Sequence, residues 1–91
     1  MQKSLKSAEY SRLIDLLVAV RKGVDVRQET LAKKLGKPQS FIAKYENGER
    51  RLDVVEFITI ARALGADPTK LFKDYVGGKG AAKTAPKRQA K

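Results

Sequence analysis

The fold is decided by residues 28–52, QETLAKKLGKPQSFIAKYENGERRL. Apolar residues in the first part recur at the spacing of one helix face, which predicts a short helix over 28–35. Gly36 directly follows and supplies a left-handed ending. A second amphipathic run, closed by an Asn-Gly pair, predicts another helix over 38–46. The stretch is therefore expected to form two short helices joined by a tight glycine turn and followed by a basic loop.

Three further helices are predicted around this stretch. One covers 8–22, with Ser7 as its N-cap. Another begins after Asp53, which forms a capping box with Glu56. The last begins at Pro68. The apolar faces of the first two should be buried, namely Leu13, Leu17 and Val20 in one and Val54, Phe57, Ile58, Ala61 and Leu64 in the other. The chain is thus expected to be all-α, a globule of five helices.

The length of 91 residues predicts one small domain, which we place at residues 1–76. Residues 77–91, GGKGAAKTAPKRQAK, contain no large apolar side chain and no acid. Such a segment cannot bury enough surface to offset its ordering entropy. We therefore expect a disordered, basic C-terminal tail.

The charge and composition narrow the function. A formal net charge of +10 favours a polyanionic partner. The chain has no cysteine and no histidine, so thiol chemistry and the commonest general base are missing. We expect no enzyme activity, no metal, no cofactor and no small-molecule ligand. Two helices joined by a glycine turn can lay the second one in the DNA major groove, so double-stranded DNA is the expected partner.

A membrane is not expected as the partner. The longest apolar run, residues 16–20, is far shorter than the ~20 residues of a membrane-spanning helix. The first residues are polar and contain no signal-peptide pattern. The expected location is therefore the cytoplasm, on the nucleoid when the protein is bound to DNA.

Residues 21–65 resemble the phage-repressor and Cro-type helix-turn-helix family, the xenobiotic-response-element type of bacterial regulators. The matching landmarks are Arg21, Gln28, Leu31-Ala32, Gly36, Ser40, Ile42, Glu46, Gly48 and Ala61 with Leu64-Gly65. The resemblance implies a compact five-helix helix-turn-helix domain. It also implies that a homodimer binds two half-sites about one helical turn apart.

The resemblance implies which side chains of the second helix face base edges: Gln39, Ser40, Ala43 and Lys44. An amide such as that of Gln39 can pair with adenine N6 and N7. Lys44 can donate to guanine O6 and N7, or it can contact a phosphate. Two roles are possible for Phe41: it can contact a thymine methyl, or it can pack at the edge of the core. We favour packing, because large aromatic side chains are more often buried.

A second set of residues is expected at the phosphates: Arg21, Gln28, Asn47, Arg50 and Arg51. Gln28 begins a helix, where free N–H groups attract anions. The family often joins the positions of Arg21 and Glu46 in a salt bridge, which makes Glu46 structural. Arg21 can then hold the bridge and contact phosphate at once.

The first hypothesis is that the protein is a sequence-specific transcriptional regulator. Of the two kinds, we favour a repressor over an activator, one that binds a pseudo-palindromic operator as a dimer and occludes the promoter. Exposed apolar residues such as Val76 can supply the dimer contact. One alternative is an antitoxin that represses its own operon. Another is a protein-interaction adaptor that binds DNA without sequence preference.

Overall fold

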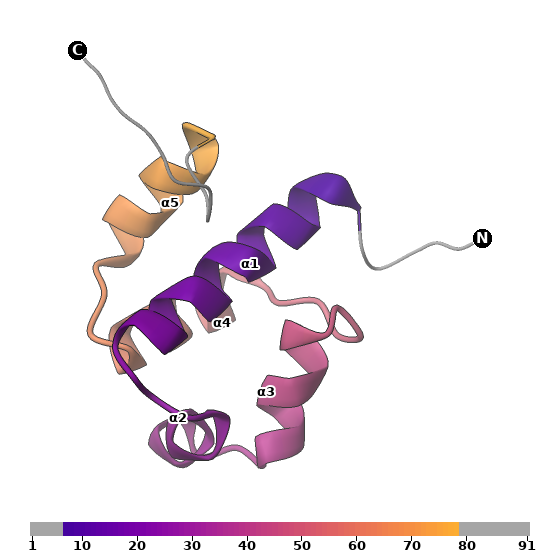
Figure 1. Cartoon of the computed structure of the whole chain (residues 1–91), viewed down its shortest axis with the longest axis vertical. Helices are drawn as coiled ribbons and strands as arrows, with labels where there is room; N and C mark the ends of the chain where they lie inside the picture. The colour runs from indigo at the N-terminus through magenta and orange to yellow at the C-terminus, as the bar shows by residue number, and fades with distance from the viewer. Residues whose placement is uncertain (1–6, 79–91) are drawn as a thin grey trace.

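The computed structural model describes residues 7–78, and these form five helices and no strand. The helices are α1 (Ala8–Gly23), α2 (Gln28–Leu35), α3 (Gln39–Glu46), α4 (Val54–Ala63) and α5 (Pro68–Val76) (Figure 1). The all-α prediction is confirmed. Apart from its first two residues, the basic segment 77–91 lies outside the described residues.

The helices surround one core (Figure 1). α1 crosses the molecule, with α2 and α3 on one side of it and α5 on the other. α4 contacts both α2 and α5, while α1 contacts α3 and α5. In Figure 1 α2 is seen almost end-on and α3 lies across the view, so the two helices cross. This crossing turns the outer side of α3 away from the core.

Side-chain caps start three of the helices. The Ser7 hydroxyl accepts from the Tyr10 N–H at 3.1 Å. Asp53 and Glu56 form the predicted capping box, in which each side chain accepts from the other residue's N–H. Asp67 accepts from the N–H of Thr69 at the start of α5. These short-range bonds explain why the predicted starts of α1, α4 and α5 agree with the structure.

α3 begins one residue later than predicted. Pro38 is its N-cap, with an extended ψ of 155°, and Gln39 is the first helical residue. The Pro38 carbonyl accepts from the Phe41 N–H at 3.0 Å. The preceding turn is as expected, because Gly36 has a φ of 67° in the left-handed region that glycine adopts without strain.

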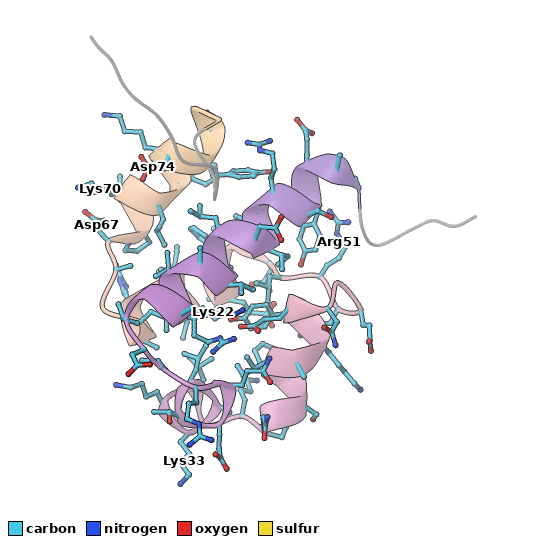
Figure 2. All side chains as sticks on the ribbon, in the orientation of Figure 1. Lys22, Lys33, Arg51, Asp67, Lys70 and Asp74 are labelled. Atoms are coloured by element: carbon cyan, nitrogen blue, oxygen red, sulfur yellow. The ribbon has the colours of Figure 1, made fainter. Side chains whose placement is uncertain are left out.

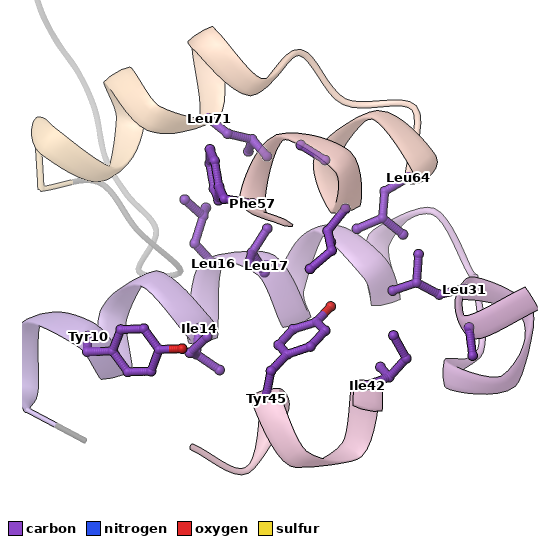
Figure 3. Close-up of a cluster of buried hydrophobic side chains, with 13 residues drawn as sticks. Tyr10, Ile14, Leu16, Leu17, Leu31, Ile42, Tyr45, Phe57, Leu64 and Leu71 are labelled. Carbon is purple, nitrogen blue, oxygen red and sulfur yellow. The ribbon is translucent and has the colours of Figure 1, made fainter. Parts of the chain in front are cut away.

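The core contains apolar side chains from all five helices (Figure 3). Leu17, Leu31, Ile42 and Tyr45 are fully enclosed. The prediction for α4 was wrong for Val54, which is 71% exposed, and it missed Ile60, which is buried. Val54 lies on the same side of α4 as the buried residues. It is the first residue of the helix, however, and the neighbouring helices do not extend far enough to cover it.

Two tyrosines tie distant segments to α1. The Tyr10 hydroxyl donates to the Arg50 carbonyl at 3.3 Å and accepts from the Leu52 N–H at 3.0 Å. These bonds hold the loop between α3 and α4 against α1. The Tyr75 hydroxyl donates to the Glu9 carbonyl at 2.9 Å, which holds the end of α5 against the start of α1.

Candidate nucleic-acid interface

The outer side of α3 carries the four residues predicted to face bases. Gln39, Ser40 and Lys44 are exposed, and Ala43 is half-buried. With 3.6 residues per turn, positions 39, 40, 43 and 44 fall within an arc of about 140° around the helix axis, which is one side of the helix. On the opposite side, Ile42 and Tyr45 are fully buried and fix the helix to the core. Because Ile42 and Tyr45 fix α3 to the core, the exposed polar row has a fixed orientation.

Arg21 and Glu46 form a salt bridge between α1 and the end of α3. Arg21 Nε donates to Glu46 Oε2 at 2.6 Å, and Nη2 donates to Oε1 at 3.1 Å. The third nitrogen, Nη1, donates to the Val26 carbonyl at 2.8 Å. The two side chains are only 11% and 7% exposed. All three guanidinium nitrogens of Arg21 are thus engaged in hydrogen bonds within the protein.

Gln28 connects this salt bridge to the base-facing row. Its Nε2 donates to Glu46 Oε1 at 2.8 Å. Its Oε1 accepts from Gln39 Nε2 at 3.3 Å. The structure therefore brings together a residue predicted at phosphate and a residue predicted at bases. Sequence reasoning missed this connection, although each glutamine is the first residue of its helix.

Arg50 is held by contacts within the loop after α3. Its two terminal nitrogens donate to the two carboxylate oxygens of Glu56 at 3.0 and 2.9 Å. These bonds, followed by the Asp53 N–H, hold the pKa of the Glu56 carboxyl below its usual value. The Arg50 guanidinium also lies 4.7 Å from the centre of the Phe41 ring. Arg50 therefore links the loop after α3 to Glu56 of α4 and to Phe41 of α3.

The remaining predicted contacts lie near the end of α3. Asn47 is the exposed C-cap residue of the helix. Arg51 is exposed, and its guanidinium lies 4.4 Å from the centre of the Tyr10 ring (Figure 2). Phe41 is half-buried and meets Tyr45 edge-to-face at 5.8 Å between ring centres, so it packs at the edge of the core.

The crossing of α2 and α3, with an exposed polar row on the second helix, defines a helix-turn-helix domain. Residues 17–71 match a family model described as Helix-turn-helix. The chain belongs to the XRE-type helix-turn-helix family of DNA-binding regulators. The resemblance inferred from the sequence landmarks is therefore confirmed. Within residues 7–78, no helix is long and apolar enough to cross a membrane.

Solved structures extend this comparison. An XRE-family like protein from Pseudomonas syringae pv. tomato str. DC3000 is 46% identical, with a TM-score of 0.75 over 77% of this chain and 85% of that one. The restriction-modification controller protein C.AhdI from Aeromonas hydrophila is 30% identical, with a TM-score of 0.65 over 72% of this chain and 100% of that one.

More distant proteins share the fold alone. One is the restriction-modification controller protein C.Esp1396I, solved as a tetramer in complex with its natural 35-base-pair operator. It is 21% identical, with a TM-score of 0.71 over 79% of this chain and 95% of that one. No curated protein sequence matches the chain.

Proposed function

We propose that this protein is a sequence-specific regulator that inserts α3 into the major groove of double-stranded DNA. The observation that carries the proposal is the exposed row of Gln39, Ser40 and Lys44 on a helix whose other side is locked into the core. Amide, hydroxyl and ammonium groups are donors and acceptors that can match base edges. The function is binding rather than catalysis.

We assign phosphate contacts to residues that flank this row. Gln28 begins α2, where backbone N–H groups lack helical partners and attract anions. Asn47 and Arg51 are exposed near the opposite end of α3, and Arg50 lies between them in the chain. For Arg21 we propose only the structural role, because its guanidinium is buried in the bridge to Glu46.

A surface for self-association lies on α4 and α5. Val54, Phe72 and Val76 are 71%, 54% and 66% exposed. Val54 and Phe72 line a groove of about 310 Å³ together with Phe57 and Ile58. The charged residues Asp67, Lys70 and Asp74 mark a different side of α5, facing away from the globule (Figure 2). Exposed apolar side chains that share a groove, as Val54 and Phe72 do, are typical of a protein interface.

We propose that a second copy of the chain covers this apolar surface. Helix-turn-helix domains gain affinity and site length when two copies read two half-sites. The fold relative C.Esp1396I is itself a tetramer on its operator. A dimer placed across a promoter would exclude polymerase, so we propose repression by occlusion as the mechanism.

Selection from a random pool of duplex DNA at near-physiological salt tests the proposed function. We expect enrichment of a short inverted repeat with half-sites about one helical turn apart. A pool that stays unenriched and binds only at low salt would contradict sequence-specific binding. That result would favour the adaptor function instead.

Val54→Glu tests the dimer surface. We expect it to raise the dimer dissociation constant at least tenfold, because it places a carboxylate in the apolar contact. Val55→Glu is the matched control, since Val55 is 70% exposed, adjacent in α4 and lines a different groove. Sedimentation equilibrium measures both variants. Equal weakening by the two variants, or none by either, would place the dimer contact elsewhere.

A further inference from the structure

The first part of α1 contacts the loop that follows α3. α1 begins at Ala8, whereas the region that matches the helix-turn-helix family begins at residue 17. Tyr10 lies in this early part of the helix, at the edge of the core, and is 6% exposed (Figure 3). The Ser7 hydroxyl accepts from the Tyr10 N–H and so fixes the start of the helix. The contacts that Tyr10 makes therefore come from a part of α1 that precedes the matched region.

The Tyr10 hydroxyl fixes the backbone on both sides of Arg51. It donates to the Arg50 carbonyl at 3.3 Å and accepts from the Leu52 N–H at 3.0 Å. These two groups belong to the peptide units that flank the Arg51 Cα, so one oxygen restrains both of the soft dihedral angles of Arg51. Arg50 Nη1 adds a third bond, to the Arg51 carbonyl at 2.9 Å. Tyr10 therefore sets the direction in which the Arg51 side chain leaves the loop.

The Tyr10 ring also restrains the far end of the Arg51 side chain. The Arg51 guanidinium lies 4.4 Å from the centre of this ring, within the range of a cation–π contact (Figure 2). Such stacking uses the flat face of the guanidinium, whereas its N–H bonds lie in its plane. A stacked arginine can therefore still offer two parallel donors to a phosphate. Because Arg51 is exposed, a phosphate can approach it from solvent.

The two arginines of this loop are held by different kinds of partner. The charge of Arg50 is balanced by the Glu56 carboxylate, to which it donates two hydrogen bonds. The Tyr10 ring is uncharged, so it orders Arg51 without neutralising it. A side chain that is already ordered loses little entropy on binding. We infer that Tyr10 is a positioning residue that holds Arg51 ready to bind a DNA phosphate beside α3. This inference rests on the proposed function.

A double-mutant cycle between Tyr10 and Arg51 tests the inference. Tyr10→Phe keeps the ring but removes both backbone bonds, and it should lower affinity for the selected operator about three- to tenfold, because Arg51 must then be ordered on binding. Arg51→Gln removes the phosphate contact, so the slope of log K against log salt should become shallower by about one. In the chain that carries Arg51→Gln, Tyr10→Phe should have no further effect on affinity.

Tyr75→Phe is the matched control for the loss of the hydroxyl. The Tyr75 hydroxyl also donates to a backbone carbonyl, that of Glu9, and its ring also has an arginine over it, Arg12 at 4.8 Å. These contacts join α1 to α5 rather than to the loop after α3, so Tyr75→Phe should bind DNA as wild type does. Affinities are compared at a temperature at which circular dichroism shows every variant to be folded.

Two measurements separate positioning from a general effect on the fold. Selection from the random pool should give Tyr10→Phe the base preferences of wild type, because phosphate contacts carry no sequence information. Arg51→Lys leaves the Tyr10 hydroxyl in place and keeps the charge, so the salt slope should stay that of wild type. Its affinity should nevertheless fall severalfold, because an ammonium lacks the flat stacking face and the paired donors of a guanidinium.

The outcomes distinguish this inference from the proposed function. An equal loss of affinity from Tyr10→Phe with and without Arg51→Gln would make Tyr10 merely structural and overturn the inference, while an enriched operator leaves the proposed function standing. Wild-type affinity in Tyr10→Phe or in Arg51→Lys, or an equal loss in Tyr75→Phe, would also overturn it. A wild-type pool without enrichment would overturn the proposed function. The cycle on an unselected duplex at low salt would then test the phosphate contact alone, and a loss confined to chains that keep Arg51 would support it.

Discussion

Lys44 lies on the exposed side of α3, where one ammonium can serve either base recognition or phosphate binding. We predict that Lys44→Ala costs about 1–3 kcal/mol on the best operator and relaxes the preference at one base position. Lys70→Ala, with the same charge change on the outer side of α5, should have little effect (Figure 2). Competition binding with single-base operator variants measures both. Equal weakening on every sequence would make Lys44 a phosphate ligand.

The buried hydroxyl of Tyr45 has no hydrogen-bond partner among residues 7–78. Burial raises the pKa of this phenol above its usual value, so the group stays neutral. A buried polar group without a partner destabilises the fold. We therefore predict that Tyr45→Phe leaves the free energy of unfolding unchanged or raises it by up to about 2 kcal/mol. Urea denaturation measures the change.

Tyr10→Phe is the matched control for that prediction. The Tyr10 hydroxyl bonds to two backbone groups of the loop after α3, so its removal leaves the Leu52 N–H without this partner. We expect this variant to lose about 1–2 kcal/mol of stability. A larger loss in Tyr45→Phe than in Tyr10→Phe would show that the Tyr45 hydroxyl has a stabilising partner.

At the scale of the element, the start of α4 combines a capping box with an ion pair. The Arg50 side chain and the Asp53 N–H both lower the pKa of Glu56 in the folded protein. The unfolded carboxyl has a pKa of about 4.3. The stability that these two contacts add is therefore fully present above the unfolded-state pKa. It is lost as the pH falls through the lower pKa that Glu56 has in the folded protein.

We predict that Glu56→Gln makes stability less dependent on pH between about 5 and 3. The glutamine oxygen can still accept from the Asp53 N–H, so the capping box is retained while the charge is removed. The loss at neutral pH should be modest, because the Arg50 side chain is 41% exposed. Urea denaturation at a series of pH values measures the slope. A slope equal to that of wild type would mean that the ion pair contributes no pH-dependent stability.

The two ends of α4 show that apolar periodicity alone does not determine which residues are buried. Residues 54, 57, 61 and 64 follow a helical spacing, yet Val54 is exposed and Leu64 is buried. Spacing tells which side of a helix is apolar. Spacing does not tell how much of that side the neighbouring helices cover, because this depends on packing. In α4 they cover Phe57 but not Val54.

At the scale of the whole molecule, the charge of residues 77–91 extends the basic character of the chain. The segment carries five cations, namely Lys79, Lys83, Lys87, Arg88 and Lys91. We predict that removing 77–91 lowers affinity on every DNA sequence. The salt dependence, as the slope of log K against log salt, should become shallower by about one for each phosphate that the segment neutralises.

Replacing the five cations with glutamine, at unchanged length, should reproduce the effect of that truncation. Binding titrations at several salt concentrations, on specific and random duplexes, measure the slopes. An unchanged slope in both variants would exclude a DNA contact by this segment. A change in the truncated chain alone would point to its length rather than its charge.

The sequence alone determined the five helices, the glycine turn and the family, because these depend on neighbours within one or two helical turns. Caps, apolar spacing and Gly36 are all readable at that range. It also identified Gln39 and Lys44 as outward-facing residues of α3, which the structure places on its exposed side. Their roles at DNA remain predictions.

Only the tertiary structure decided which polar groups meet. Gln28 lies 18 positions from Glu46 and 11 from Gln39, and these contacts exist because α2 and α3 cross at one particular place. The same is true of Tyr10, whose hydroxyl meets a carbonyl 40 positions away. Such pairings depend on how helices are placed against a shared core. Local spacing fixes each helix face but leaves that placement to the packing of all five helices together.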